Sequence, residues 1–258
     1  MNRRRIALGA AGVAGVVLVL EAASRTGLAD ETALPPMSTV LREAFELGGD
    51  NDFLVDLGAT LKAWAGGLAL AVLAAVPLGV LLGSVPLLGT ASRALVELCR
   101  PIPSVALIPL AIIMFSSVTQ MKMSLIFYAS VWPILVNTLY ALRDVDPVAK
   151  ESLRAFGFGT PSVLWRVSLP SAAPFILTGV RIAASVALIV VISTELLSGG
   201  DNGVGIYLTE TQAGGGRTDL MLAGACWAGV LGLLANAGLL RLERIAFRWH
   251  SARAEGVA

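Results

Sequence analysis

Residues 63–92 read AWAGGLALAVLAAVPLGVLLGSVPLLGTAS, thirty consecutive residues without a charged side chain. A helix needs about 20 mostly apolar residues to cross a bilayer, so this stretch is long enough for one span. The rest of the chain has the same character: of its 258 residues 56% are hydrophobic and 14% are charged, with a mean hydropathy of +0.78. Soluble domains carry about 25% charged residues. The composition therefore excludes a water-soluble domain and predicts an all-α polytopic membrane protein.

Further apolar runs give the number of spans. Four of them, residues 101–121, 123–142, 172–194 and 220–240, contain at most one charged side chain each. Another run, residues 6–20, has no polar side chain and follows three arginines, which is typical of a secretory signal or of a first helix that is kept. Because the rest of the chain inserts through its own helices, we expect this run to be kept. The sequence therefore predicts six transmembrane helices.

Basic residues are divided unevenly between the predicted loops. If the N-terminus is inside, the inner loops and tail hold Arg93, Arg100, Arg143, Lys150, Arg154, Arg166, Arg241, Arg244, Arg248 and Arg253. The outer loops hold only Arg25, Arg42, Lys122 and Arg217, with Lys62 at a helix edge, and residues 21–56 are acidic. The positive-inside rule then predicts a multi-pass protein of the inner (plasma) membrane with both termini in the cytoplasm.

This topology sets the expected organisation of the chain. We expect a cytoplasmic end and first helix in residues 1–24, an extracytoplasmic segment in 25–57, a five-helix core in 58–245 and a cytoplasmic tail in 246–258. The core includes a cytoplasmic loop over residues 143–173.

That cytoplasmic loop carries strong helix signals. Asp146 before Pro147 is typical of a helix start. The aspartate carboxylate can accept hydrogen bonds from the unpaired backbone amides of the first turn, and the N–H that proline lacks would have no partner in that turn. Thr160 before Pro161 repeats the pattern. Gly157 and Gly159 are expected to end the first helix, and Leu169-Pro170 to end the second. The loop is therefore predicted to be two short helices joined by a glycine turn.

The same loop resembles the cytoplasmic loop of ABC-importer permease subunits. In that family a Glu-Ala-Ala sequence is followed by Gly six residues after the Glu, and by Leu-Pro with the Pro thirteen residues after the Gly. Glu151, Gly157, Leu169 and Pro170 match this spacing, whereas Ser152 and Leu153 replace the two alanines. The resemblance implies that the first short helix is a coupling helix that docks on a separate ATPase subunit. The residues implied in coupling are Lys150, Glu151, Ser152, Leu153, Arg154, Ala155, Phe156, Gly157, Leu169 and Pro170.

Other stretches are similar to the nitrate/sulfonate/taurine branch of these permeases. They are residues 20–25, 34–36, 100–103 with Pro109, 132–138 and 177–181, while residues 115–120 lack the Phe-Gly-x-Gly turn common in that branch. The resemblance implies the type I ABC-importer transmembrane fold and a small solute such as a sulfonate, nitrate or taurine. It also implies the partners: two ATPase subunits, a second permease copy, an extracytoplasmic solute-binding protein and the lipid bilayer, with no nucleic acid.

Catalysis by this chain is not expected. It has no Gly-x4-Gly-Lys-Ser/Thr motif, so ATP and magnesium would be used by the partner ATPase, and no cofactor or metal is expected on this chain. The alternatives are a secondary transporter or channel without an ATPase partner, and a membrane-embedded enzyme. The scarcity of charge within the spans and the lack of a nucleophile–base pair argue against both.

Six residues are candidates for the translocation path. Pro103 and Pro109 interrupt one predicted span, and the remaining four are Asn137, Ser193, Thr194 and Glu195. Glu195 lies toward the outer end of the fifth span, where a carboxylate is costly. We expect it either to line an outer gate or to fix the glycine-rich segment that follows. Arg181, fourteen residues earlier, is expected to be an interfacial anchor or a partner for the acids of the coupling loop.

Overall fold

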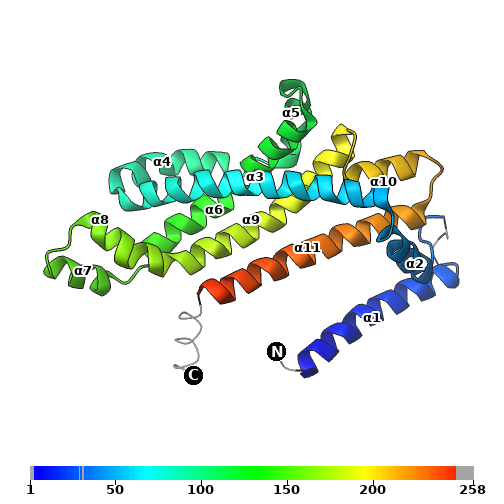
Figure 1. The fold of residues 1–258 in the computed structure, drawn as a ribbon, viewed down its shortest axis with the longest axis horizontal. Helices are drawn as coiled ribbons and strands as arrows, with labels where there is room; N and C mark the ends of the chain where they lie inside the picture. The colour runs from blue at the N-terminus through cyan, green and yellow to red at the C-terminus, as the bar shows by residue number, and fades with distance from the viewer. Residues whose placement is uncertain (1–2, 29, 31, 248–258) are drawn as a thin grey trace. The chain divides into compact units, whose positions relative to one another are not determined.

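The computed structural model describes residues 3–28, 30 and 32–247, and every secondary-structure element in this part of the chain is a helix (Figure 1). The helices are α1 Arg3–Arg25, α2 Met37–Leu47, α3 Asn51–Ser84, α4 Pro86–Cys99, η1 Ser104–Leu107, α5 Ile108–Met114, α6 Val118–Arg143, α7 Pro147–Ala155, α8 Thr160–Val163, η2 Leu164–Ser168, α9 Leu169–Ser198, α10 Val204–Ala213 and α11 Thr218–Ala246. They form two compact units, one of residues 1–60 with 200–230 and one of residues 61–199 with 231–258. The all-α polytopic prediction is confirmed.

Five stretches of the described chain are long and apolar enough to span a membrane, and α4 with η1 and α5 makes a sixth, bent by 76°. Two of the predicted spans differ from the helices in the structure. The run 63–92 breaks at Val85, which is extended because the following Pro86 disfavours a helical residue before it. The run 101–121 is not one helix: prolines at 101 and 103 prevent continuation from α4, and α5 ends at an extended Phe115.

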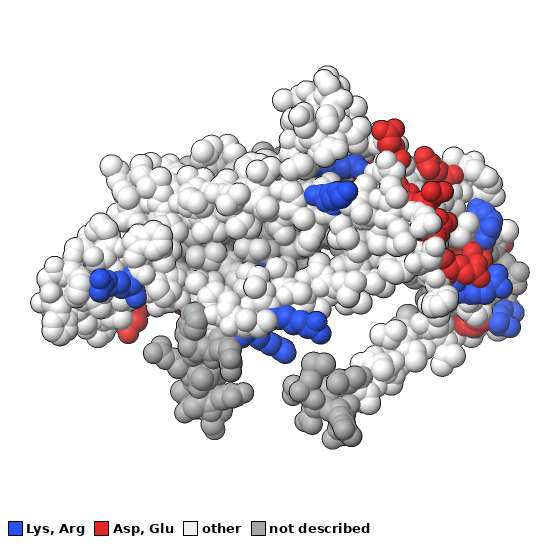
Figure 2. All heavy atoms as spheres, viewed as in Figure 1, with Lys and Arg blue, Asp and Glu red and all other residues white. Residues whose placement is uncertain are grey.

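The first unit has its own small core. Val40 and Leu47 of α2 pack with Phe53 of α3 and Ala223 of α11. The indole of Trp227 packs on Phe53 and donates to the carbonyl of Ala44, 2.8 Å away, which fixes α2 to α11. Acidic side chains gather over the part of this unit that holds α2 and α10 (Figure 2).

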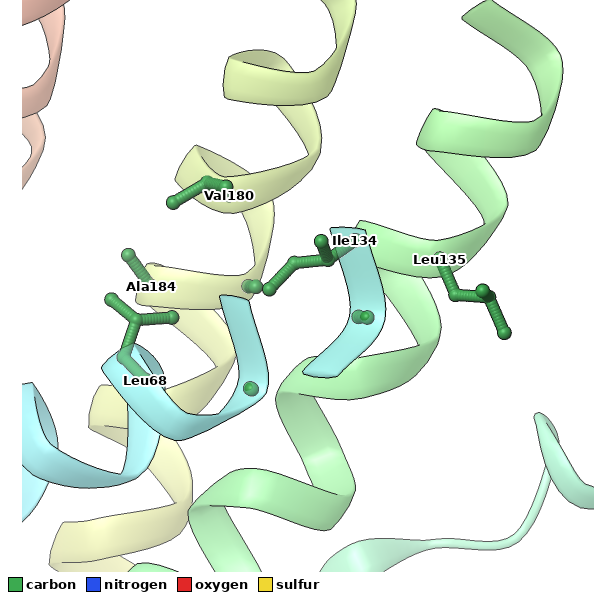
Figure 3. Packing of buried hydrophobic residues seen from close by; sticks show 8 residues of the cluster. Leu68, Ile134, Leu135, Val180 and Ala184 are labelled. Carbon is green, nitrogen blue, oxygen red and sulfur yellow. The ribbon is translucent and has the colours of Figure 1, made fainter. Parts of the chain in front are cut away.

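In the second unit, α6 and α9 pack along their lengths as an antiparallel pair, and residues 61–84 of α3 lie against them (Figure 3). Leu68 of α3, Ile134 of α6 and Val180 of α9 belong to this shared core. A β-carbon added at Gly67, Gly79 or Gly83 of α3 would lie 2.6, 2.7 or 2.9 Å from side-chain atoms of Ile126, Thr138 or Leu142. Only glycine therefore permits this close approach of α3 to α6.

These three contacts also give the direction of the helices. In each pair the α6 residue lies 59 positions after the α3 glycine, so α3 and α6 run parallel. Two parallel spanning helices require the chain between them to cross the membrane once in the opposite direction. The bent pair α4 and α5 is the segment that does so, which brings the described spans to six.

Candidate coupling segment and buried charges

The start and the end of α7 follow from its sequence. An Asp146 carboxylate oxygen accepts a hydrogen bond from the amide of Val148 at 2.8 Å, and Pro147 is the first helical residue. At the other end Gly157 has a φ of +84°. Its amide donates to the Arg154 carbonyl at 2.9 Å, and the next amide, of Phe158, donates to the Leu153 carbonyl at 3.2 Å. This pair of bonds is a Schellman motif, which needs a left-handed residue at position 157. The predicted start and glycine end of this helix are confirmed.

The second short helix differs from the prediction. It begins at Thr160 as expected, although the residue in the capping position is Gly159 and no side chain caps the helix. It does not end at Leu169-Pro170. A π-helical turn over residues 164–168 leads directly into α9, and the amide of Leu169 donates to the carbonyl of Leu164. In a regular α-helix, Pro170 would clash with a carbonyl of the preceding turn; the wider π turn relieves that clash. Residues 160–198 are thus one continuous helical stretch.

The base of the loop is packed and its tip is exposed. Leu142, Val145 and Ala172 are buried together at the base. The tip carries large exposed apolar side chains, with Phe156 82%, Trp165 72% and Val148 66% exposed. Large apolar side chains left exposed on a polar projection are typical of a surface that contacts another protein or the membrane.

The coupling residues expected from the sequence take different places in this projection. Glu151, Ser152, Arg154, Ala155, Phe156 and Gly157 are exposed along α7 and its turn, Leu153 is half-buried, and of the closing pair Leu169 is half-buried and Pro170 exposed. Lys150 is also half-buried, and its ammonium donates to the carbonyl of Leu142 at 3.1 Å, which ties α7 back to the end of α6.

Sequence reasoning missed three exposed members of this surface. They are Val148, Phe158 and Trp165. The guanidinium carbon of Arg166 lies 5.0 Å from the centre of the Phe158 ring, in a cation–π contact. The available signal was the occurrence of large apolar residues in a loop that is otherwise polar.

A buried ion pair joins the far ends of α6 and α9. Lys122 donates to a Glu195 carboxylate oxygen at 2.9 Å, and the two side chains are 5% and 0% exposed. The prediction that Lys122 lies in an outer loop is wrong. Antiparallel packing of α6 on α9 brings these two residues together although they are 73 positions apart. The signal that could have suggested the pair was a single charged residue at the edge of an apolar run, Lys122 between two runs and Glu195 directly after another.

The other expected path residues are dispersed. Thr194 donates within its own helix to the carbonyl of Val190, and Ser193 beside it is half-buried. Pro103 precedes η1 and Pro109 lies in the first turn of α5, both exposed.

Asn137 lies deeper in α6. Its amide donates to the carbonyl of Pro133, one turn earlier in the helix, and its β-carbon packs on Gly179 of α9. Along α6 it lies about 22 Å from Lys122, so the structure does not bring Asn137 to Glu195.

Arg181 does not pair with an acid of the coupling loop, contrary to one of the two expectations. Its guanidinium lies 2.9 Å from a carboxylate oxygen of Glu243 on α11. Both side chains are about one-third exposed.

Comparisons with known proteins agree with this architecture. The family model described as "Binding-protein-dependent transport system inner membrane component" matches residues 75–245. The chain is 31% identical to the taurine transport system permease protein TauC of Escherichia coli K12, over 84% of this chain and 80% of that protein. It is 26% identical to the bicarbonate transport system permease protein CmpB of Synechocystis (91% of this chain, 86% of that protein) and 27% identical to the nitrate import permease protein NrtB of Leptolyngbya laminosa (74% and 67%).

Proposed function

Because the chain belongs to the family of binding-protein-dependent transport system inner membrane components, we propose that it forms the transmembrane path of an ATP-driven importer. Two copies would enclose the path, two separate ATPase subunits would use ATP and magnesium, and an extracytoplasmic solute-binding protein would deliver the solute. Relatives are named for taurine, bicarbonate and nitrate, which supports a small solute that carries an anionic group.

The observation that carries this proposal is the shape of the coupling segment. An ATPase that closes on ATP must push on a part of the permease that is exposed at its tip and firmly held at its base. The α7 projection has both properties, with Phe156 and Val148 exposed and with Val145 and Leu142 buried beneath it. A secondary transporter or channel docks no ATPase subunit, so an exposed projection of this kind favours the importer.

The order of crossings supports the orientation. Among the residues that the structure describes, the segments 26–50 and 199–217 contain helices of 11 and 10 residues only, which are too short to span a bilayer. If each long helix crosses once, the start of α1 and the end of α11 then lie on the same side as α7. The positive-inside rule assigns that side to the cytoplasm.

Co-purification tests the docking surface. Phe156→Asp removes the most exposed aromatic ring of the tip and adds a charge, so we expect it to abolish capture of the ATPase subunit and ATP-driven uptake in proteoliposomes. Phe45→Asp on α2 is the matched control, because its ring is also exposed, at 87%, but lies in the other unit. Uptake by the chain alone, or equal ATPase capture by both variants, would refute the proposal.

A further inference from the structure

A basic pocket lies at the base of the coupling segment. It has a volume of about 120 Å³, and its walls include Ser84 of α3, Leu142 of α6, Lys150 and Arg154 of α7, Thr160 of α8 and Ser168 of η2. We call it the basal pocket. Lys150 and Arg154 are the charged residues in its walls, and among the residues that the structure describes neither of them makes an ion pair. The basal pocket therefore carries two positive charges that no acidic side chain of its own walls offsets.

Hydroxyl groups add further donors to the walls. Ser168 is 6% exposed and lines the pocket, yet its hydroxyl has no hydrogen-bond partner in the described part of the chain. Buried hydroxyls are normally paired, so this one points to a ligand. Thr160 and Ser84 add two more hydroxyls. Two cations and three hydroxyls together suit a negatively charged group with several acceptor oxygens, and a phosphate is such a group.

The ends of the spanning helices place the basal pocket at the membrane surface. Helix α6 has 26 residues and is about 39 Å long, which matches the thickness of a bilayer with its headgroup regions, about 40–45 Å. Leu142 is next to the last residue of α6, and Ser84 is the last residue of α3, which is also long enough to span. Both residues line the pocket, so it lies at the level of the lipid phosphates and not within the hydrocarbon core.

We propose that the basal pocket binds the headgroup phosphate of an anionic phospholipid. Lys150 and Arg154 contact phosphate oxygens in this complex, and Ser168 donates its hydroxyl to another. Basic pockets between spanning helices select anionic lipids. Phosphatidylcholine and phosphatidylethanolamine carry an ammonium group, which two uncompensated cations repel.

The walls favour a lipid over an acidic side chain of the ATPase subunit. The ends of two spanning helices line the pocket, so a lipid reaches it from within the bilayer. The surface that we assign to the ATPase is instead the exposed tip at Phe156 and Val148. A phosphate held by α7 and η2 beside the ends of α3 and α6 would stiffen the base against which the ATPase pushes. This consequence for coupling rests on the proposed function, whereas lipid binding itself does not.

Native mass spectrometry of the purified full-length chain in neutral detergent tests the site without an ATPase. It gives the apparent dissociation constant of the first bound phosphatidylglycerol, with phosphatidylcholine as the reference lipid. Lys150→Gln/Arg154→Gln is expected to weaken phosphatidylglycerol binding at least about tenfold, because it removes two charge-assisted contacts. Arg241→Gln/Arg244→Gln is the matched control: it removes the same charge from two exposed arginines of α11 outside the pocket and is expected to bind the lipid as the unaltered chain does.

A second variant separates binding from folding. The Ser168 hydroxyl has no partner in the described chain, so Ser168→Ala should leave the unfolding temperature unchanged and still weaken phosphatidylglycerol binding about two- to tenfold. Lys150→Arg/Arg154→Lys keeps both charges and should retain most of the affinity.

Several results would overturn the assignment. Equal affinity in the Gln variant of the pocket and the control, or equal loss in both, would show that the pocket is not the site. Phosphatidylcholine binding as tight as that of phosphatidylglycerol would exclude selection by charge. Displacement of the lipid by an equal concentration of inorganic phosphate would assign the pocket to a free anion, and displacement by the ATPase subunit would assign it to the ATPase interface.

Failure of the proposed function would appear differently. In that case the assembled complex would show no ATP-driven uptake in vesicles of any lipid composition, while phosphatidylglycerol would still bind in the basal pocket. If the pocket assignment alone is wrong, uptake occurs, but the Gln variant binds phosphatidylglycerol as well as the control does.

Discussion

The turn that ends α7 offers a sharp test of coupling, because two glycines two residues apart differ in conformation. Gly157 has a φ of +84°, whereas Gly159 has a φ of −71° and a ψ of 165° in the capping position of α8. The same substitution, to serine, should therefore impair coupling at position 157 and be tolerated at position 159. Serine at 159 fits an extended capping position and is a preferred residue there. Serine at 157 is forced into the left-handed region.

The size of the effect follows from the surroundings of Gly157. No heavy atom lies within 4 Å of an added β-carbon, so Gly157→Ser causes no clash and its cost is conformational only. That cost is about 1–2 kcal/mol for a residue with a side chain. If coupling needs the Schellman turn, this energy reduces the population of the competent turn by about 5- to 30-fold. Since the turn is exposed, the unfolding temperature of the membrane core should not change.

The assay is ATP-driven uptake in proteoliposomes that contain the ATPase and the solute-binding protein, together with the unfolding temperature of each variant. Gly157→Ser should lower uptake several-fold or more, and Gly159→Ser should leave it unchanged. Gly157→Asn should recover part of the activity, because asparagine tolerates the left-handed region. Equal uptake by the two serine variants would refute the claim that this turn geometry positions the coupling helix.

Three further predictions concern stability and capping. Glu195→Gln leaves the buried Lys122 ammonium without its carboxylate and should cost about 3–5 kcal/mol, whereas Lys122→Met/Glu195→Gln should cost much less, as measured by unfolding in detergent; additive losses would refute the pair. Gly79→Ala places a β-carbon 2.7 Å from a side-chain carbon of α6 and should destabilise by about 1–3 kcal/mol, while Gly58→Ala meets nothing within 4 Å and serves as its control in the same measurement. Asp146→Ala removes a cap worth about 1 kcal/mol and should speed amide hydrogen exchange in the first turn of α7 alone; unchanged exchange there would contradict the capping role.

Features that depend on neighbours in sequence were predictable. The start of α7 at Asp146-Pro147 and its end at Gly157 need only the chemistry of a few adjacent residues. The spans were predictable for a related reason, because the length of an apolar run is itself the requirement that the bilayer imposes. Four of the six predicted spans coincide with long helices, and the failures occurred where prolines interrupt a run, at 86 and at 101–103.

Features that depend on packing were not predictable from single runs. The pairing of Lys122 with Glu195, and that of Arg181 with Glu243, requires knowledge of which helices are neighbours and in which direction they run. The prediction that the helix ends at Leu169-Pro170 was wrong for a different reason. The proline rule is correct for an α-helix, but one π turn is a local alternative that satisfies the rule without ending the helix.

That continuity changes how the coupling segment can act. If the helix ended at Leu169, a non-helical connection would separate the loop from α9. A displacement of the loop would then bend that connection and leave α9 in place. In the structure, the helical backbone continues without a break from Thr160 to Glu195, about 50 Å along the axis, although Pro170 and Pro174 within it donate no backbone hydrogen bond. At one end Lys150 ties α7 to the carbonyl of Leu142 on α6, and at the other end Lys122 of α6 holds Glu195. Because α6 and α9 are joined by this ion pair at one end, by the packing of Leu142 with Ala172 at the other and by contacts along their length, a displacement of α7 should move the two helices together as one body and not bend one against the other.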